Sequence, residues 1–136
     1  MGEKAPDPGW TTRGVITRVI DGDTVEVEIT RKIVVRLRDC WAPEKRLDPS
    51  IQGEIDRNAA KLRGVASAVH LQQLAEGQPC TVSIPTHAED DGVTQDIADS
   101  LAMGRVVGDV WIYDGLNLAA VQVARGYATA TKGGGK

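Results

Sequence analysis

The chain has 136 residues, of which 41% are hydrophobic and 26% are charged. This composition is typical of one folded globular domain and excludes a disordered chain. Sixteen basic and nineteen acidic side chains give a formal net charge of −3, so a nucleic-acid partner would need a local basic patch.

The sequence shows no targeting or membrane-spanning segment and no disulfide framework. The N-terminal segment has no apolar run of the signal-peptide kind, and no stretch is long enough to cross a bilayer. We therefore expect a cytoplasmic protein without membrane contact. Cys40 and Cys80 are too few to define a disulfide framework, and we do not expect a bond between them.

Three short strands are expected first along the chain. Residues 14–20 and 24–30 flank Asp21-Gly22-Asp23, a turn signal between two β-type segments. In residues 24–30, valine and isoleucine alternate with glutamate and threonine, which is the period of a half-buried strand. Residues 33–38 alternate in the same way. These segments predict an antiparallel meander with carboxylates at its first turn.

The period then changes from that of a strand to that of a helix. Over residues 54–75, apolar side chains recur at steps of four and three residues, which predicts an amphipathic helix whose apolar face meets the core. The residues of this apolar stripe are Ile55, Ala59, Leu62, Ala66 and Val69. Gly77 and Pro79 are expected to end the helix.

Two further strands, residues 80–84 and 104–113, are separated by the polar segment 85–103, whose length indicates a functional or mobile connection. Asn117 is expected to cap a last short helix over residues 118–125. The order of elements predicts a β-rich α+β fold. This is a five-stranded OB-fold barrel with a long helix between strands 3 and 4 and a short C-terminal helix.

Several separate motifs resemble the staphylococcal nuclease (thermonuclease) family. They are Val19-Ile20-Asp21-Gly22-Asp23-Thr24-Val25, Val35-Arg36-Leu37, Ala42-Pro43-Glu44, Gly104-Arg105-Val106-Val107-Gly108-Asp109-Val110, Asp114-Gly115-Leu116-Asn117-Leu118-Ala119 and Gly126-Tyr127-Ala128. The resemblance implies an OB barrel with flanking helices and a calcium-dependent phosphodiesterase that cleaves DNA and RNA. We expect this domain to span residues 14–128, after an N-terminal extension (1–13) and before a flexible tail (129–136).

The resemblance also implies roles for individual residues. Asp23 is the metal-binding carboxylate, Arg36 and Arg105 bind phosphate, and Glu44 handles the attacking water. Two guanidiniums suit the charge that develops on the equatorial oxygens of phosphorus. A cation held by aspartate polarises the phosphate. Taken singly, each residue is more often a surface side chain, but their joint occurrence at strand ends favours a site.

Position 41 departs from the family pattern. The family has a second metal-binding aspartate three residues before the glutamate, and Trp41 stands there in this chain. An indole cannot ligate calcium, so the expected ligands are Asp23 and the backbone carbonyl of Ala42. Trp41 itself is either a space-filling aromatic or a surface for base stacking. The candidates to replace the missing carboxylate are Asp39, Asp96 and Asp99.

Two functions from different classes remain. The first is a monomeric, metal-dependent nuclease that hydrolyses phosphodiester bonds of DNA and/or RNA with a divalent cation, calcium by resemblance. The second is a nucleic-acid-binding OB module with little catalysis. Retention of Glu44 beside the arginines favours the enzyme, since a binder does not need a water-activating acid. Trp41 and the negative net charge favour the binder.

Overall fold

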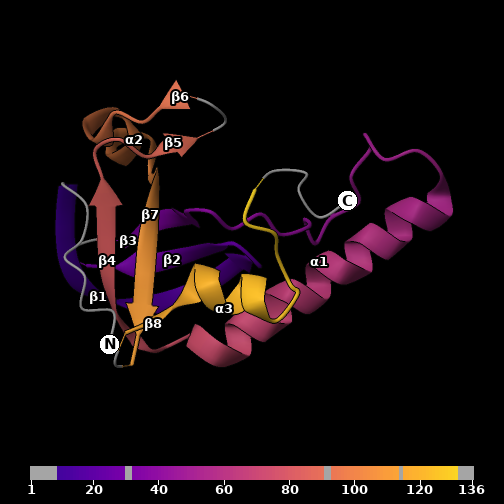
Figure 1. Cartoon of the computed structure of the whole chain (residues 1–136), viewed down its shortest axis with the longest axis horizontal. Coiled ribbons are helices and arrows are strands. Elements are labelled where there is room, and N and C mark those ends of the chain that lie inside the picture. The colour runs from indigo at the N-terminus through magenta and orange to yellow at the C-terminus, as the bar shows by residue number, and fades with distance from the viewer. Residues whose placement is uncertain (1–8, 30–31, 91–92, 114, 132–136) are drawn as a thin grey trace.

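The computed structural model describes residues 9–29, 32–90, 93–113 and 115–131. Five long strands form a closed barrel, crossed by one long helix and flanked by a short C-terminal helix (Figure 1). This is the OB-type barrel that the sequence predicts. The barrel strands are β1 (Gly9–Asp21), β2 (Thr24–Glu28), β3 (Lys32–Leu37), β4 (Pro79–Pro85) and β7 (Arg105–Ile112).

The strand pairing closes the barrel through one parallel contact. β1 pairs antiparallel with β2 and β4, β2 with β3, and β4 with β7, which confirms the predicted meander. β3 and β7 then run parallel, with Val34 opposite Arg105 and Arg36 opposite Val107. Just beyond, Arg38 and Asp109 form an ion pair with Nη2 and Oδ2 2.7 Å apart. The parallel junction therefore brings two arginine-bearing strands side by side.

Most predicted boundaries agree with the structure within one or two residues, but the start of β1 does not. β1 begins at Gly9, five residues before the predicted start, and residues 9–15 pair with β4. The predicted second strand ended at Thr30, which lies outside the described residues, as do residues 1–8 of the expected extension, 132–136 of the expected tail, and Asp114. Among the described residues, no helix is both long and apolar enough to span a membrane.

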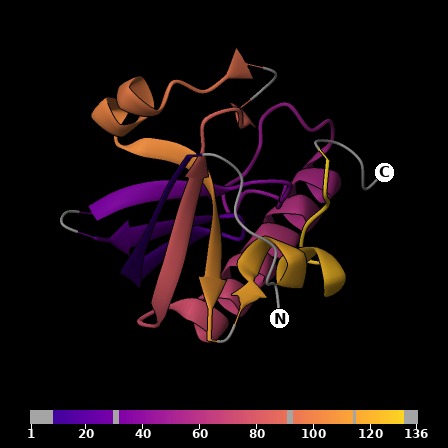
Figure 2. The ribbon, with the colours of Figure 1, turned by 60° about the vertical axis from the view of Figure 1, so that its left-hand side comes forward.

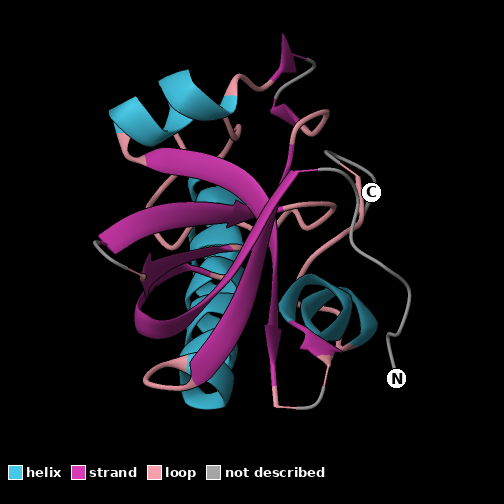
Figure 3. Cartoon of the chain, turned by 90° about the vertical axis from the view of Figure 1, so that its left-hand side faces the viewer, coloured by secondary structure: helices cyan, strands magenta, loops and turns pink. Residues whose placement is uncertain are grey.

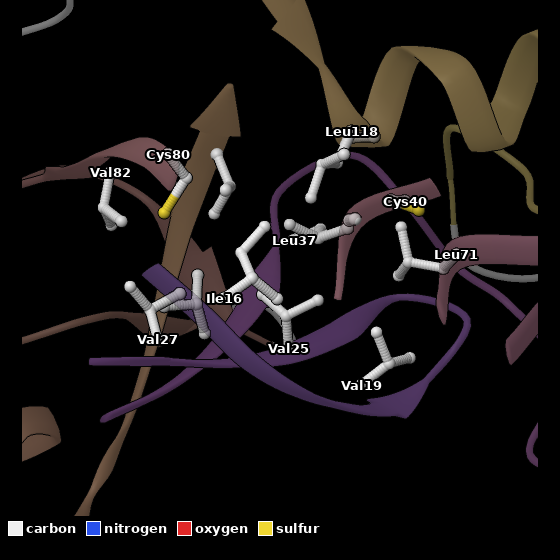
Figure 4. Close-up of a cluster of buried hydrophobic side chains, with 14 of the residues drawn as sticks. Ile16, Val19, Val25, Val27, Leu37, Cys40, Leu71, Cys80, Val82 and Leu118 are labelled. Atoms are coloured by element: carbon white, nitrogen blue, oxygen red, sulfur yellow. The ribbon is translucent and has the colours of Figure 1, made fainter. Parts of the chain in front are cut away.

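The core fills the barrel with aliphatic side chains from alternate strand positions (Figure 4). Leu71 from α1 (Glu54–Ala75) and Leu118 from α3 (Leu118–Ala124) pack against the same cluster. Figure 3 shows that α1 lies across one side of the barrel. Cys40 and Cys80 are buried and not bonded to each other, as expected.

The buried face of α1 is not the predicted one. The helix buries mainly small residues, namely Ala60, Gly64, Ser67, Ala68, Leu71 and Ala75. The predicted stripe faces the other way, with Ile55 84% exposed and Leu62 69% exposed. Close packing explains the difference. A Cβ on Gly64 would lie 1.9 Å from the carbonyl oxygen of Glu44, so the helix approaches the chain too closely for large side chains.

The long connection between β4 and β7 contains β5 (Glu89–Asp90), β6 (Val93–Thr94) and α2 (Ile97–Met103). Figure 2 shows these elements together, next to the start of β7. The side-chain amide of Gln95 donates to the carbonyl of Val107 and accepts from its N–H, both at 2.9 Å. A side chain thus takes the place of a strand neighbour and holds the connection to β7.

The C-terminal helix begins as predicted. β8 (Leu116–Asn117) pairs with the end of β7 and leads directly into α3. The Asn117 side chain accepts a hydrogen bond of 3.0 Å from the amide of Ala120, which satisfies one of the free donors of the first turn.

We predict that Gly64→Ala destabilises the protein. Alanine is worth about 1 kcal/mol more than glycine in a helix interior. The new methyl group would, however, meet the backbone of Glu44, and overpacking of this kind costs about 1–3 kcal/mol. Urea unfolding should therefore show a net loss of stability. Asn58→Ala on the exposed side of the same helix is the control and should be neutral or stabilising; an equal gain from both changes would contradict the close contact.

Candidate functional site

The candidate site lies on the outer wall of the barrel, where β2, β3 and β7 are neighbours. Arg36 in β3 stands opposite Thr24 of β2 and opposite Val107 of β7. Asp23 immediately precedes Thr24. Although both charged side chains are on the outer wall, Asp23 is only 9% exposed and Arg36 only 6% exposed. They are buried because the chain after β3 folds back over them.

The guanidinium of Arg36 is held by the backbone that covers it. Its Nη1 donates to the carbonyl of Leu37 at 2.7 Å and to that of Cys40 at 2.6 Å. Its Nη2 is buried and has no hydrogen-bond partner among the described residues. The nearest acidic oxygen, Oδ2 of Asp23, is 4.0 Å away, beyond hydrogen-bond distance. Nη1 is therefore saturated with acceptors, whereas the buried Nη2 has none among the described residues.

Trp41 covers one face of this guanidinium. The Cζ atom of Arg36 lies 4.0 Å from the centre of the indole ring, a cation–π contact worth about 0.5–2 kcal/mol depending on desolvation. The backbone of Trp41 is itself fixed, because it exchanges hydrogen bonds with Thr129. Trp41 thus packs against an arginine, and base stacking, the other role expected for it, stays a prediction.

Asp23 joins the turn to the covering segment. Its Oδ1 accepts from the hydroxyl of Thr24 and its Oδ2 from the amide of Ala42, both at 2.8 Å. Its carbonyl accepts from the amide of Leu37 at 2.8 Å. The two residues expected to bind metal, Asp23 and Ala42, are thus in direct contact. Each carboxylate oxygen keeps a second lone pair that a cation can use.

Glu44 is exposed and lies beside a second aspartate of the turn. Burial is the largest cause that raises the pKa of Asp21, and the negative charges of Asp23 and Glu44 add to it. A hydrogen bond from the backbone amide of Lys45, together with its ammonium charge, acts in the opposite direction. Asp23 and Glu44 therefore both lie within electrostatic reach of Asp21. Asp21 was not assigned a role from the sequence, although its position in the same turn was the available signal.

Arg105 is exposed at the first residue of β7. Its register opposite Val34 puts it on the same outer face as Arg36, two positions along the neighbouring strand. Standard strand spacing and rise place the two Cα atoms about 8 Å apart. No described residue forms a hydrogen bond or ion pair with Arg105. Both predicted arginines thus lie on one face, one buried and held, the other free to move.

The three candidates for a replacement carboxylate do not complete a metal cage. Asp39 is exposed in a turn, with φ 57°, and Asp96 is used to cap α2, accepting from the amide of Asp99. Within the described ranges, no group of three or more histidine, cysteine, aspartate or glutamate side chains is placed to hold a metal ion. Burial raises the pKa of the Cys40 thiol to about 12, so the thiol is protonated in the metal-free protein.

A buried amide positions the turn against the helices. Gln122 of α3 is fully buried, and its Nε2 donates to the carbonyl of Gly22 at 2.7 Å and to the hydroxyl of Ser67 at 3.0 Å. Its Oε1 accepts from Nδ1 of His70, whose ring stacks on Tyr127 at 4.3 Å. A lone polar residue on the apolar face of the short helix was the sequence signal for this network.

The turn also fits α1 sterically. A Cβ on Gly22 would lie 1.8 Å from the hydroxyl oxygen of Ser67. Only glycine therefore allows the turn to pack so closely, and the two aspartates on either side of it are fixed relative to α1.

Comparison with known proteins shows that the chain is similar to two relatives. The chain is 32% identical over 116 residues to proteins named "uncharacterized endonuclease" from Escherichia coli and from Escherichia coli O157:H7. The match covers 85% of this chain but 58% of each relative, so the chain spans less than two thirds of their length. No protein-family model matches the chain.

Gln122→Met should destabilise the protein by about 1–3 kcal/mol, because the substitution keeps the volume but leaves the buried carbonyl of Gly22 without its donor. The measurement is the free energy of unfolding in urea. Gln73→Met, at an exposed position of α1, is the matched control and should change stability by less than about 0.5 kcal/mol. Equal effects of the two changes would show that the buried network contributes nothing.

Proposed function

We propose that this chain is a metal-dependent nuclease that hydrolyses phosphodiester bonds of DNA and/or RNA, of the thermonuclease type. The observation that carries the proposal is Nη2 of Arg36, a buried donor that has no acceptor among the described residues. A buried donor without an acceptor costs about 1–3 kcal/mol, so its presence needs a reason, and an acceptor supplied by a ligand is the one we propose. A planar, charged donor beside a second arginine fits a phosphate oxygen.

In this proposal, the two arginines bind the phosphate and Glu44 accepts the proton. Nη2 of Arg36 donates to one non-bridging oxygen of the phosphate, and Arg105 reaches another from the neighbouring strand. Glu44 takes a proton from the water whose oxygen forms the new bond to phosphorus. The bond to the leaving oxygen breaks, and that oxygen takes a proton from solvent. Added charge on the phosphorane oxygens is then met by the two guanidiniums, of which that of Arg36 is held in place.

The acidic residues fit a cation that is only partly bound by protein. Asp23 has lone pairs left, the carbonyl of Ala42 is the second proposed ligand, and Asp21 is a nearby carboxylate. Two carboxylates with water and substrate phosphate suit Mg²⁺, or Ca²⁺ with several water ligands. When bound, such a cation polarises the phosphate and lowers the pKa of coordinated water.

The relatives support this proposal at a coarse level, because both are named as endonucleases. The alternative, a binding module without catalysis, is favoured by one observation, the absence of a three-residue metal cluster among the described residues. The position of Glu44 near Asp21, which belongs to the same turn as Asp23, favours the enzyme.

Cleavage of a labelled oligonucleotide tests the proposal directly. We expect activity with at least one of calcium, magnesium and manganese, and none with a chelator. Glu44→Gln should lower kcat by about 10²–10⁴-fold, and Arg105→Ala by about 10²–10³-fold, with unchanged circular dichroism. Arg125→Ala, at another exposed arginine, is the control. Activity that survives both site substitutions contradicts the assigned site, and binding without cleavage in the wild type supports the module.

Position 41 can be tested for its effect on the cation. Trp41→Asp adds a carboxylate beside Asp23 and should lower the calcium concentration needed for half-maximal activity. Trp41→Phe keeps an aromatic face over Arg36 and should leave that concentration unchanged while raising KM modestly. If the two variants titrate alike with calcium, position 41 does not face the cation.

A further inference from the structure

The outward face of α1 is apolar. Ile55, Leu62 and Val69 are spaced by seven residues, which is two helical turns, and all three side chains are exposed. Val65, also exposed, lies between them along the helix. The apolar stripe therefore runs along the side of α1 that points away from the barrel, opposite the small residues that the helix buries.

Such an arrangement is the reverse of an ordinary surface helix, which buries its large aliphatic side chains and exposes its polar ones. Contiguous exposed aliphatic side chains mark an interaction surface more often than single ones do. Figure 1 shows the N-terminal half of α1, which carries Ile55 and Leu62, extending beyond the barrel, so this half is accessible to another molecule.

The charges beside the stripe are arranged in two blocks. Glu54 and Asp56 are acidic and precede the basic residues Lys61 and Arg63, and all four side chains are exposed. Glu54 and Lys61 lie on one flank of the stripe, and Asp56 and Arg63 on the other, because each pair is seven residues apart. None of the four has an ion pair with another described residue.

We propose that α1 pairs with α1 of a second copy of this chain in an antiparallel, two-fold arrangement. With the axis between Asn58 and Ala59, Ile55 of each copy is level with Leu62 of the other. A two-fold antiparallel pair also brings each flank against the same flank of the second copy. The acidic block of one helix then faces the basic block of the other, within one helical turn.

The charges select this register over the competing one. An axis at Leu62 would align Ile55 with Val69 and would bury a longer part of the stripe. It would also bring Lys61 and Arg63 of the two copies together, and like charges at such positions oppose pairing. The proposal replaces the monomer expected from the sequence, and it is independent of the proposed nuclease activity.

Sedimentation equilibrium across micromolar to millimolar concentrations tests the pairing. The average mass of the wild-type chain should rise from one copy toward two with concentration. Leu62→Glu should keep the chain at one copy without loss of circular dichroism, since Leu62 is exposed. Met103→Glu, at another exposed apolar position outside α1, is the control and should associate like the wild type. A wild-type chain that remains single throughout overturns the proposal.

A charge exchange tests the register. One variant carries Glu54→Lys with Asp56→Lys, and another carries Lys61→Glu with Arg63→Glu. Each alone should associate more weakly than the wild type, because like charges then face each other. An equimolar mixture should associate again, because every flank pairs opposite charges. Self-association of either variant at wild-type strength, or no gain on mixing, would overturn the antiparallel pairing.

Discussion

A buried guanidinium on the outer wall of a barrel places strong demands on the chain around it. Arg36 lies on a strand face that would normally meet water, and it must find acceptors once it is covered. The carbonyls of Leu37 and Cys40 meet that need only because the chain bends sharply after β3. The same bend places Trp41 over the guanidinium and the amide of Ala42 on Asp23. The candidate site is a consequence of this burial.

The second constraint is the closeness of α1 to the barrel. Small residues on its inner face allow the turn at Gly22 and the backbone of Glu44 to approach the helix directly. Gln122 then fixes the turn with hydrogen bonds that span distant parts of the chain. Rigid support of this kind is what a phosphate site requires, because preorganised donors are not reoriented during the reaction. The large side chains of α1 are left on the outside.

Most of the secondary structure could be read from local patterns. The alternation in β2 and β3, the helical period of α1 and the cap at Asn117 all depend on neighbouring residues, and all are confirmed. The buried face of α1 could not be read in this way, because two faces of the helix could pack and only the close approach at Gly64 decides between them. Hydrophobicity alone indicated the wrong face.

For the site, the sequence by itself determined which functional side chains are present: two arginines, an aspartate at a turn and a glutamate after a proline. It also determined that position 41 holds no carboxylate. Only the tertiary structure decided that Arg36 is buried with one nitrogen that has no acceptor among the described residues, that Trp41 stacks on it, and that Glu44 lies near Asp21. The contacts of Asp21 and Asp23 with the segment after β3 join distant parts of the chain. Trp41 is close to Arg36 in the sequence, but its bridge to Thr129 is not local, so no local pattern encodes these features.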